Sequence, residues 1–446
     1  MNKQEILQRI KNAGVIGAGG AGFPTYKKLD ATVEHIIANG AECEPLLYKD
    51  RSVMLQETDA LLRGLSIMKE LTGAQKVTIA LKEKNRDLVE LMKPQADRLD
   101  FDFLVYEDVY PAGDEYILVY EVTGRRIPPG GIPLQVGVVV DNVETIINIA
   151  YAVDDNRPVV EKYVTVTGAV KEALTTRVPV GTTFGDCIAL AGGATVEQAA
   201  ILTGGVMMGG VEFDLNTPLA KNVGGVIVLP ADHYLVRRKT TPKETYHRIG
   251  HGQCDQCSLC TEMCPRYILG YPIEPHKVMR NLLMTGEAKE RASLWAQYCC
   301  ECNVCTLIAC PEGLDPKNIC VDAKSLLREK GLSRTPEELD VLFRDVHPAR
   351  KGREIPIDTV YRRLGLKPYD RHAEFQSVSF APREVIIPLD SHIGQPATPK
   401  VQVGQQVEAG SVIADVLPEA LGAAVHASIG GQVTRIEARG IHIRAK

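Results

Sequence analysis

The sequence has no long apolar run and few aromatic residues. No apolar stretch approaches the ~18 residues of a transmembrane helix, and no apolar segment follows the opening residues Met1 to Glu5. Aromatic residues make up 5% of the chain, with one tryptophan, and the formal net charge is -5. We therefore expect a protein that is neither exported nor membrane-spanning, and the charge gives no indication of a nucleic-acid partner.

The sequence also gives no sign of the oxidising compartment in which disulfides form. Nine of its twelve cysteines fall between Cys254 and Cys310 at regular short spacings, and a chain without an export signal sits in a reducing compartment. The cysteine pattern therefore predicts metal binding. The length of 446 residues predicts about two to four domains.

The cysteines form two consecutive runs. The first, Cys254-x2-Cys257-x2-Cys260-x3-Cys264-Pro265, has the spacing by which bacterial ferredoxins hold a cubane cluster, and the fourth cysteine of such a run binds the neighbouring cluster. A second run begins at Cys299 and ends at Cys310-Pro311. We predict two [4Fe-4S] clusters with crossed ligands: Cys254, Cys257, Cys260 and Cys310 for the first, and Cys299, Cys302, Cys305 and Cys264 for the second.

The second run is irregular. It has one residue more than usual before Cys310, and Cys300 lies next to Cys299 and could replace it as a ligand, although only Cys299 keeps the two-residue gap to Cys302. A pair of zinc knuckles is the alternative to cubanes, but two successive Cys-Pro endings disfavour it. We expect the second cluster to be the more labile one, or the one nearest the electron acceptor.

A glycine-rich loop near the N-terminus satisfies the G-x-G-x-x-G dinucleotide fingerprint. It covers residues 17–22, and Glu42 lies twenty residues beyond it. A helix predicted over residues 4–12 leaves almost no room for the strand that a Rossmann loop requires, and Pro24 follows at once. We therefore favour a loop whose backbone closely approaches a phosphate or a flat ring.

Four ordered motifs carry a family resemblance. They are residues 19–25 (GGAGFPT), residues 39–51 (NGAECEP to KDR), residues 113–115 (GDE) and residues 141–145 (DNVET). They resemble the FMN-binding subunit of respiratory complex I and, more closely, the C subunit of Rnf complexes. The resemblance implies an α/β flavin domain that passes hydride from NADH to FMN.

Carried over motif by motif, the resemblance assigns site residues. Glu44 and Glu115 would line the nicotinamide pocket as the catalytic pair, and Asn39 and Asn142 would hydrogen-bond FMN. The cofactor-binding set is completed by Gly17, Gly19, Gly20, Gly22, Lys28, Glu42, Gly113, Asp114 and Asp141. Two positions depart from complex I: Ala41 replaces an acidic residue and Asp141 an asparagine. A flavin is needed between NADH and the clusters because hydride carries two electrons and a cluster accepts one.

The remaining segments predict β-rich modules. Short runs of alternating apolar and polar residues between Tyr163 and Pro230 resemble the β-grasp (SLBB) domain of the same families. The loop at residues 204–210 contains Met207 and Met208, for which a packing or turn role is favoured over contact with a ligand. Strands after Arg383 resemble the barrel-sandwich fold of lipoyl carriers, but no lysine lies near the expected hairpin tip at Ala420. A structural or docking role is left.

These observations give a multidomain α/β plus α+β organisation. We expect an FMN- and NADH-binding domain (1–155), a β-grasp SLBB domain (160–235), a helical ferredoxin-like domain with two clusters (240–330), a connector (331–380) and a non-acylated barrel-sandwich domain (381–446).

The domain order and the string at residues 270–277 (GYPIEPHK) resemble the cobalamin reductases of propanediol-utilisation microcompartments. The resemblance implies a cytoplasmic, microcompartment-associated oxidoreductase that reduces cobalamin with NADH, with an adenosyltransferase and shell proteins as partners. No D-x-H-x-x-G cobalamin motif occurs in the chain. The alternatives are an electron-input subunit of a membrane Rnf-like complex, and a redox scaffold that never meets NADH.

Overall fold

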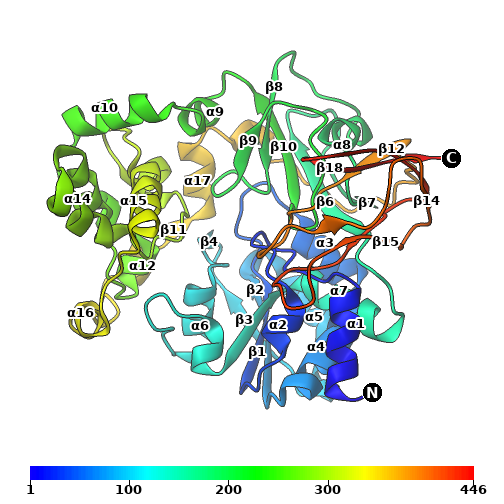
Figure 1. Ribbon diagram of the computed structural model, residues 1–446. Helices are drawn as coiled ribbons and strands as arrows, with labels where there is room; N and C mark the ends of the chain where they lie inside the picture. Colours follow the sequence, from blue (N-terminus) through cyan, green and yellow to red (C-terminus); the bar gives the residue numbers. More distant parts are fainter.

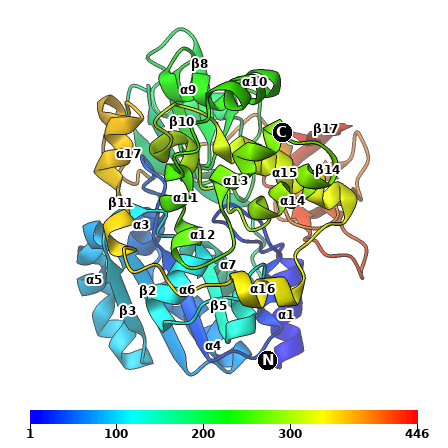
Figure 2. The same ribbon diagram turned by 90° about the vertical axis from the view of Figure 1, so that its left-hand side faces the viewer.

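A computed structural model describes residues 1–446 as a parallel α/β unit, a mixed β unit, a helical unit and a C-terminal β unit (Figure 1). The helical unit and the C-terminal β unit lie on opposite sides of the other two, as the rotated view also shows (Figure 2). None of the helices combines the length and the apolar character needed to cross a bilayer.

The first unit is built on a four-stranded parallel sheet in the order β3-β2-β1-β5. Its central strand carries an apolar run, Ile36-Ile37-Ala38, that is buried on both faces, as expected of a parallel sheet covered by helices. The strands are β1 His35–Gly40, β2 Lys76–Lys82, β3 Asp102–Tyr106 and β5 Val138–Asn142, and β4 is Val109–Tyr110. The helices are α1 Lys3–Asn12, α2 Thr25–Leu29, α3 Lys49–Gln56, α4 Thr58–Thr72, α5 Arg86–Ala96, α6 Glu115–Thr123 and α7 Val143–Asp154.

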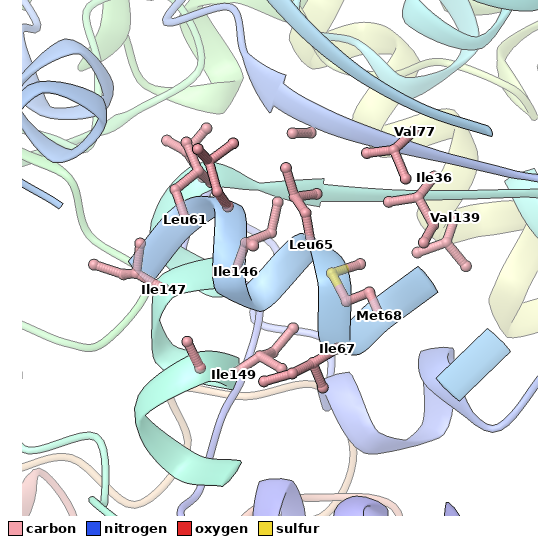
Figure 3. Packing of buried hydrophobic residues seen from close by; sticks show 14 of the residues in the cluster. Ile36, Leu61, Leu65, Ile67, Met68, Val77, Val139, Ile146, Ile147 and Ile149 are labelled. Carbon is pink, nitrogen blue, oxygen red and sulfur yellow. The ribbon is translucent and has the colours of Figure 1, made fainter. Parts of the chain in front are cut away.

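Helices α4 and α7 pack together over one face of this sheet (Figure 3). Leu65 and Met68 of α4 meet Ile146 of α7 and the sheet residue Ile36, and all four are buried. The two helix backbones approach closely at Gly64, where a Cβ atom would collide with the carbonyl oxygen of Ile146. Helix α6 covers the other face, so the sheet ends are fixed from both sides.

The second unit is a five-stranded mixed sheet in the order β7-β6-β10-β8-β9. Only the β10–β6 pair is parallel, and the buried helix residue Phe184 closes its core. Its elements are β6 Glu161–Gly168, β7 Leu174–Pro179, α8 Phe184–Leu190, β8 Ala199–Thr203, β9 Gly210–Glu212 and β10 Gly225–Pro230.

The third unit is helical and carries both cysteine runs. A π-helical turn spans Cys305–Ala309, so the extra residue before Cys310 is accommodated by widening one helical turn. The helices are α9 Tyr234–Lys239, α10 Lys243–Gln253, α11 Leu259–Glu262, α12 Pro265–Ile268, α13 Pro275–Met279, α14 Gly286–Ser293 and α15 Pro316–Lys330.

The segment that follows returns to the first two units before the final β unit. Its strand β11 (Ile355–Pro356) pairs with β4 of the α/β unit, and the neighbouring helices are α16 Pro336–Leu342 and α17 Ile357–Arg363. The last unit packs two small sheets, β12-β18-β17-β14 and β13-β15-β16, around a common apolar core. Its strands are β12 Glu384–Ile387, β13 Thr398–Pro399, β14 Gln406–Val407, β15 Val412–Asp415, β16 Val425–His426, β17 Gly431–Glu437 and β18 Gly440–Ala445.

Candidate flavin and iron–sulfur sites

A pocket of about 670 Å³ opens at the carboxyl ends of β1 and β5, the edge at which parallel α/β sheets bind ligands. Seven of the predicted site residues line it together: Gly19, Gly20, Asn39, Glu42, Glu44, Gly113 and Asn142. The second unit, expected from the sequence to be a β-grasp domain and called the β-grasp unit below, adds Gly204, Asn222 and Gly224. The pocket is therefore shared between the first two units.

The glycine loop follows helix α1 and precedes the sheet, so it is not the strand-to-helix turn of a Rossmann fold. The backbone amides of Gly19, Gly20 and Ala21 donate no hydrogen bond within the chain, whereas the amide of Gly17 donates to the carbonyl of Phe23 at 2.9 Å. Three free amides at the mouth of a pocket suit a phosphate group, and the bare backbone of Gly20 leaves space for it. The residues present therefore fit a flavin phosphate.

Four predicted residues lie beside the pocket without lining it. The ammonium of Lys28 is 3.0 Å from the Asp141 carboxylate and 3.9 Å from that of Glu115, whose side chain is 47% exposed. Burial lowers the pKa of Lys28, but Asp141 and Glu115 together more than offset this and the pKa is raised overall. Asp114 caps helix α6 and pairs with Arg266 at 2.7 Å, so it joins the α/β unit to the helical unit.

Gly17 and Gly22 belong to the loop but do not line the pocket. The side chains of Asn39 and Asn142 are engaged by the protein itself. Asn39 donates to the Gly113 carbonyl at 3.1 Å, and Asn142 caps α7 and donates to Asp50 at 3.0 Å.

A buried charged network under the pocket was not predicted from the sequence. The ammonium of Lys49 lies 2.6 Å from Asp50, 3.0 Å from Glu144 and 3.1 Å from the Asn142 amide oxygen, and Lys49 is only 4% exposed. Lys162 also binds Glu144. Burial alone would lower the pKa of Lys49, but Asp50 and Glu144 raise it above its ordinary value. Lys49 and Glu144 lie in the motifs at residues 39–51 and 141–145, and this was the only sequence signal that could have pointed to them.

Glu42 is buried at the base of the pocket, where its carboxylate accepts the backbone amide of Asp50 at 2.6 Å. Burial, together with the nearby Asp50 charge, raises the pKa of Glu42 to about 7. A carboxyl group with this pKa can hold or release a proton near neutral pH.

Glu44 joins the pocket to the β-grasp unit. Its carboxylate accepts the backbone amides of Met207 at 2.8 Å and Met208 at 2.7 Å, and burial raises its pKa. The Met207 side chain is fully buried while that of Met208 is 55% exposed, so the loop acts here through its backbone. A Cβ atom on Gly205 would collide with the Glu44 side chain.

The structure brings the first predicted cysteine set together, and the ligand assignment itself stays a prediction. Cys254, Cys257, Cys260 and Cys310 together line one cavity of about 350 Å³. Burial raises the pKa of the Cys260 thiol to about 12, with further contributions from the thiols of Cys254, Cys310 and Cys257. Cys310 thus reaches the first run across the helical unit.

The second set is crowded with thiols. Burial raises the pKa of Cys264, helped by the thiols of Cys300 and Cys299, and the nearby Cys300 thiol contributes to the raised pKa of Cys302. The fully buried Cys320 thiol lies near Cys299 and lowers the pKa of Cys299 to about 7. Cys299 and Cys300 are therefore both within reach of this set, and the ligand assignment stays a prediction. No group of three or more His, Cys, Asp or Glu side chains converges as for a single metal ion.

The second set lies on the flavin-pocket side of the helical unit. The Tyr110 hydroxyl donates to the carbonyl of Cys302 at 2.8 Å, and the Asn303 amide donates to the carbonyl of Met207 at 2.9 Å. Met207 is the residue whose amide binds Glu44. The irregular run therefore adjoins the flavin pocket, whereas Cys257 of the first set is exposed.

Family models match all four units. The Nuo51 FMN-binding domain matches residues 10–151, the SLBB domain 163–211, the 4Fe-4S dicluster domain 253–315 and the RnfC barrel sandwich hybrid domain 365–446. The expected multidomain fold is confirmed. The chain is thus an oxidoreductase of the flavin and iron–sulfur class, with an FMN-binding domain and a dicluster domain.

Individual relatives narrow this class. The chain is 40% identical to cobalamin reductase PduS of Salmonella typhimurium over 99% of its length and 97% of that protein, and 39% identical to PduS of Citrobacter freundii over 99% and 96%. The chain belongs to the PduS family. It is 33% identical to the RnfC-type component of the proton-translocating ferredoxin:NAD(+) oxidoreductase complex of Clostridium ljungdahlii, over 60% of this chain and 57% of that component.

A solved structure shares the fold at low sequence identity. An NAD+-reducing [NiFe]-hydrogenase in its H2-reduced state aligns with a TM-score of 0.50 and 20% identity over 75% of this chain and 68% of that chain.

Proposed function

We propose that the chain is an NADH-dependent cobalamin reductase. It takes hydride from NADH at the flavin pocket and passes single electrons through two [4Fe-4S] clusters to cob(III)alamin or cob(II)alamin. The likeness to PduS over nearly the whole length of both proteins supports this acceptor. The Rnf-type alternative is less favoured, because the match to the RnfC-type component spans only 60% of the chain and the barrel-sandwich domain comes last here.

The contact between the flavin pocket and the second cysteine set carries the proposal. Glu44 in the pocket, the Met207 peptide and Asn303 form a chain of hydrogen bonds of 2.8 and 2.9 Å that ends between Cys302 and Cys305. A bound flavin converts a two-electron hydride into single electrons. The second cysteine set, beside the pocket, would hold the cluster nearer the flavin, and the first set, whose Cys257 is exposed, would hold the cluster nearer the surface.

The pocket residues have distinct roles in this scheme. Glu42, with its pKa near 7, holds a proton at the base of the pocket. The free amides of Gly19, Gly20 and Ala21 bind the flavin phosphate. Glu44 is fixed by two backbone amides, and the exposed Glu115 beside Lys28 faces the incoming nicotinamide.

The exposed position of Cys257 indicates where the electron acceptor and its partners would meet the protein. A corrinoid is too large for the flavin pocket, so it meets the protein at the surface around Cys257, where Leu259 is 43% exposed. In this role the protein works in a bacterial microcompartment beside an adenosyltransferase, which consumes low-valent cobalt, and its shell proteins.

Anaerobic reconstitution with FMN, iron and sulfide, followed by NADH and cobalamin, tests the function. We expect NADH-dependent growth of the cob(II)alamin absorption band. No such band alongside rapid reduction of an artificial acceptor would contradict the acceptor. A flavin spectrum that NADH does not bleach would contradict both enzyme hypotheses and favour a redox scaffold.

A further inference from the structure

The C-terminal barrel-sandwich unit lies against the glycine loop, with Ile393 371 residues after Gly22 in sequence. The backbone amide of Ile393 donates to the carbonyl of Gly22 at 3.0 Å. A Cβ atom on Gly22 would lie 2.6 Å from the Ser391 carbonyl oxygen and 3.2 Å from the His392 Cα atom. The two backbones are thus in direct contact at Gly22, next to the loop residues Gly19 and Gly20 that line the flavin pocket.

Lys221 connects three units at this point. It belongs to the β-grasp unit, and its ammonium donates to the carbonyl of Gly14 at 3.0 Å and to that of Ala424 in the barrel-sandwich unit at 3.3 Å. Its neighbour Asn222 donates to the carbonyl of Gly20 at 2.8 Å and lines the flavin pocket. One short segment therefore holds the base of the glycine loop, its tip and the barrel.

Burying the Lys221 amine is energetically unfavourable unless its hydrogen bonds to the two carbonyls compensate for the lost hydration. The residue is 5% exposed and forms no ion pair, and burial lowers its pKa to about 7. Burying an amine without a carboxylate costs free energy that an apolar side chain of the same length would avoid. The compensation visible in the structure is the pair of carbonyl bonds between units.

The barrel is in turn held by the β-grasp unit. The Ser428 hydroxyl donates to the carbonyl of Val180 at 2.6 Å, and the Ile386 amide donates to that of Gly181 at 3.0 Å. These hydrogen bonds fix the position of the barrel on the β-grasp unit, next to the glycine loop.

We propose that the barrel-sandwich unit clamps the flavin-phosphate loop, and that Lys221 is the positioning residue that couples the two. Holding the loop in its binding conformation removes part of the ordering cost of FMN binding, which is the general effect of preorganisation. The non-acylated barrel then acts in cofactor retention. This inference rests on FMN binding alone and not on the identity of the acceptor.

FMN retention by the full-length, cluster-loaded protein tests the clamp. For Lys221→Met, which keeps the side-chain length and removes the amine, we expect the FMN dissociation constant to rise about tenfold, equivalent to about 1.4 kcal/mol. Cluster absorbance and iron content stay unchanged. Lys400→Met is the matched control, because Lys400 is 57% exposed and pairs only with Asp415 within the barrel; its FMN affinity should equal that of the parent.

A pair of glycine variants tests the same contact without replacing Lys221, although a Cβ atom on Gly14 would also lie 2.8 Å from the Lys221 ammonium nitrogen. Gly14 and Gly73 both have left-handed backbones, with φ of +65° and +72°, but only at Gly14 would a Cβ atom collide with Ala424 of the barrel, while nothing lies within 4 Å at Gly73. Backbone strain is therefore matched. We expect FMN release from Gly14→Ala and not from Gly73→Ala.

Two results would overturn the clamp. One is parental FMN affinity in Lys221→Met with intact clusters, and the other is equal FMN affinity in the two glycine variants. If Lys221→Met does not fold, the glycine pair decides the question. FMN retention is measured by fluorescence of the released cofactor, so a failure to reduce cobalamin would leave the readout unaffected.

Discussion

Lys49 offers the sharpest test of how the flavin pocket is supported. It is 4% exposed, and its side chain faces the carboxylates of Asp50 and Glu144, whose side chains are 10% and 2% exposed. Lys49→Met keeps the volume and leaves one net negative charge buried. Removing one partner of a buried ion pair typically costs about 3–5 kcal/mol.

Two neighbouring side chains reduce the expected cost of Lys49→Met. Lys162 still binds Glu144, although burial lowers its pKa to about 8, and Asn142 still donates to Asp50. We therefore expect the low end of the range, about 3 kcal/mol. The exposed pair between Lys3 and Asp30, 41% and 61% exposed, provides a control of at most about 1 kcal/mol in Lys3→Met.

The assay is native-state hydrogen exchange of the β1 and β5 amides, which reports opening of the α/β unit rather than of the whole chain. FMN affinity should fall in parallel, because the network fixes Asn142 at the pocket floor. A loss of less than about 1 kcal/mol in Lys49→Met, equal to that in Lys3→Met, would refute the buried network as a support.

Three further predictions concern packing, protonation and the clusters. Gly64→Ala should destabilise the α/β unit in urea unfolding by about 1–3 kcal/mol despite the better helix propensity, because its Cβ would collide with Ile146; a gain in stability would contradict the close helix contact. The raised pKa of Glu42 means that its contribution to stability is present below about pH 4.5 and is lost as pH rises through about 7; Glu42→Gln should therefore gain stability relative to the parent across that window, and a pH-independent difference would argue against it. Cys257→Ala should lose one cluster by EPR and iron analysis while keeping FMN, whereas loss of both cofactors would contradict separate sites.

The local motifs predicted much of the site because they place backbone and ligands within a few residues of one another. The glycine loop, Asn39, Glu42 and Glu44 come together because β1 and β5 end at the same sheet edge, which the parallel α/β fold implies. The cysteine spacing predicted that Cys310 would join the first run; Cys310 lines the same cavity as that run, and its role as a ligand stays a prediction.

Long-range contacts were beyond the sequence patterns. Glu44 finds its partners at Met207 and Met208, more than 160 residues later, and no periodicity links these positions. The charged residues Lys49 and Glu144 give no local sign that they are buried, because burial depends on how the second unit covers the first.

The second cysteine run was the least predictable part. Its extra residue suggested a labile cluster or one nearest the acceptor, and both stay predictions; in the structure the π-helical turn absorbs the extra residue and the run lies beside the flavin pocket. The proximity of Cys320 to Cys299, which lowers the pKa of Cys299, comes from tertiary packing that spacing alone does not encode.

The central claim is that electrons enter at the flavin pocket and leave towards cobalamin through the clusters. Anaerobic stopped-flow mixing of the loaded protein with NADH and cob(III)alamin tests it directly, with flavin, cluster and cob(II)alamin absorption followed together. We expect flavin bleaching first, cluster bleaching next and the cob(II)alamin band last, with that band abolished in Cys257→Ala. Formation of cob(II)alamin at the parental rate in Cys257→Ala, or before the clusters are reduced, would contradict it.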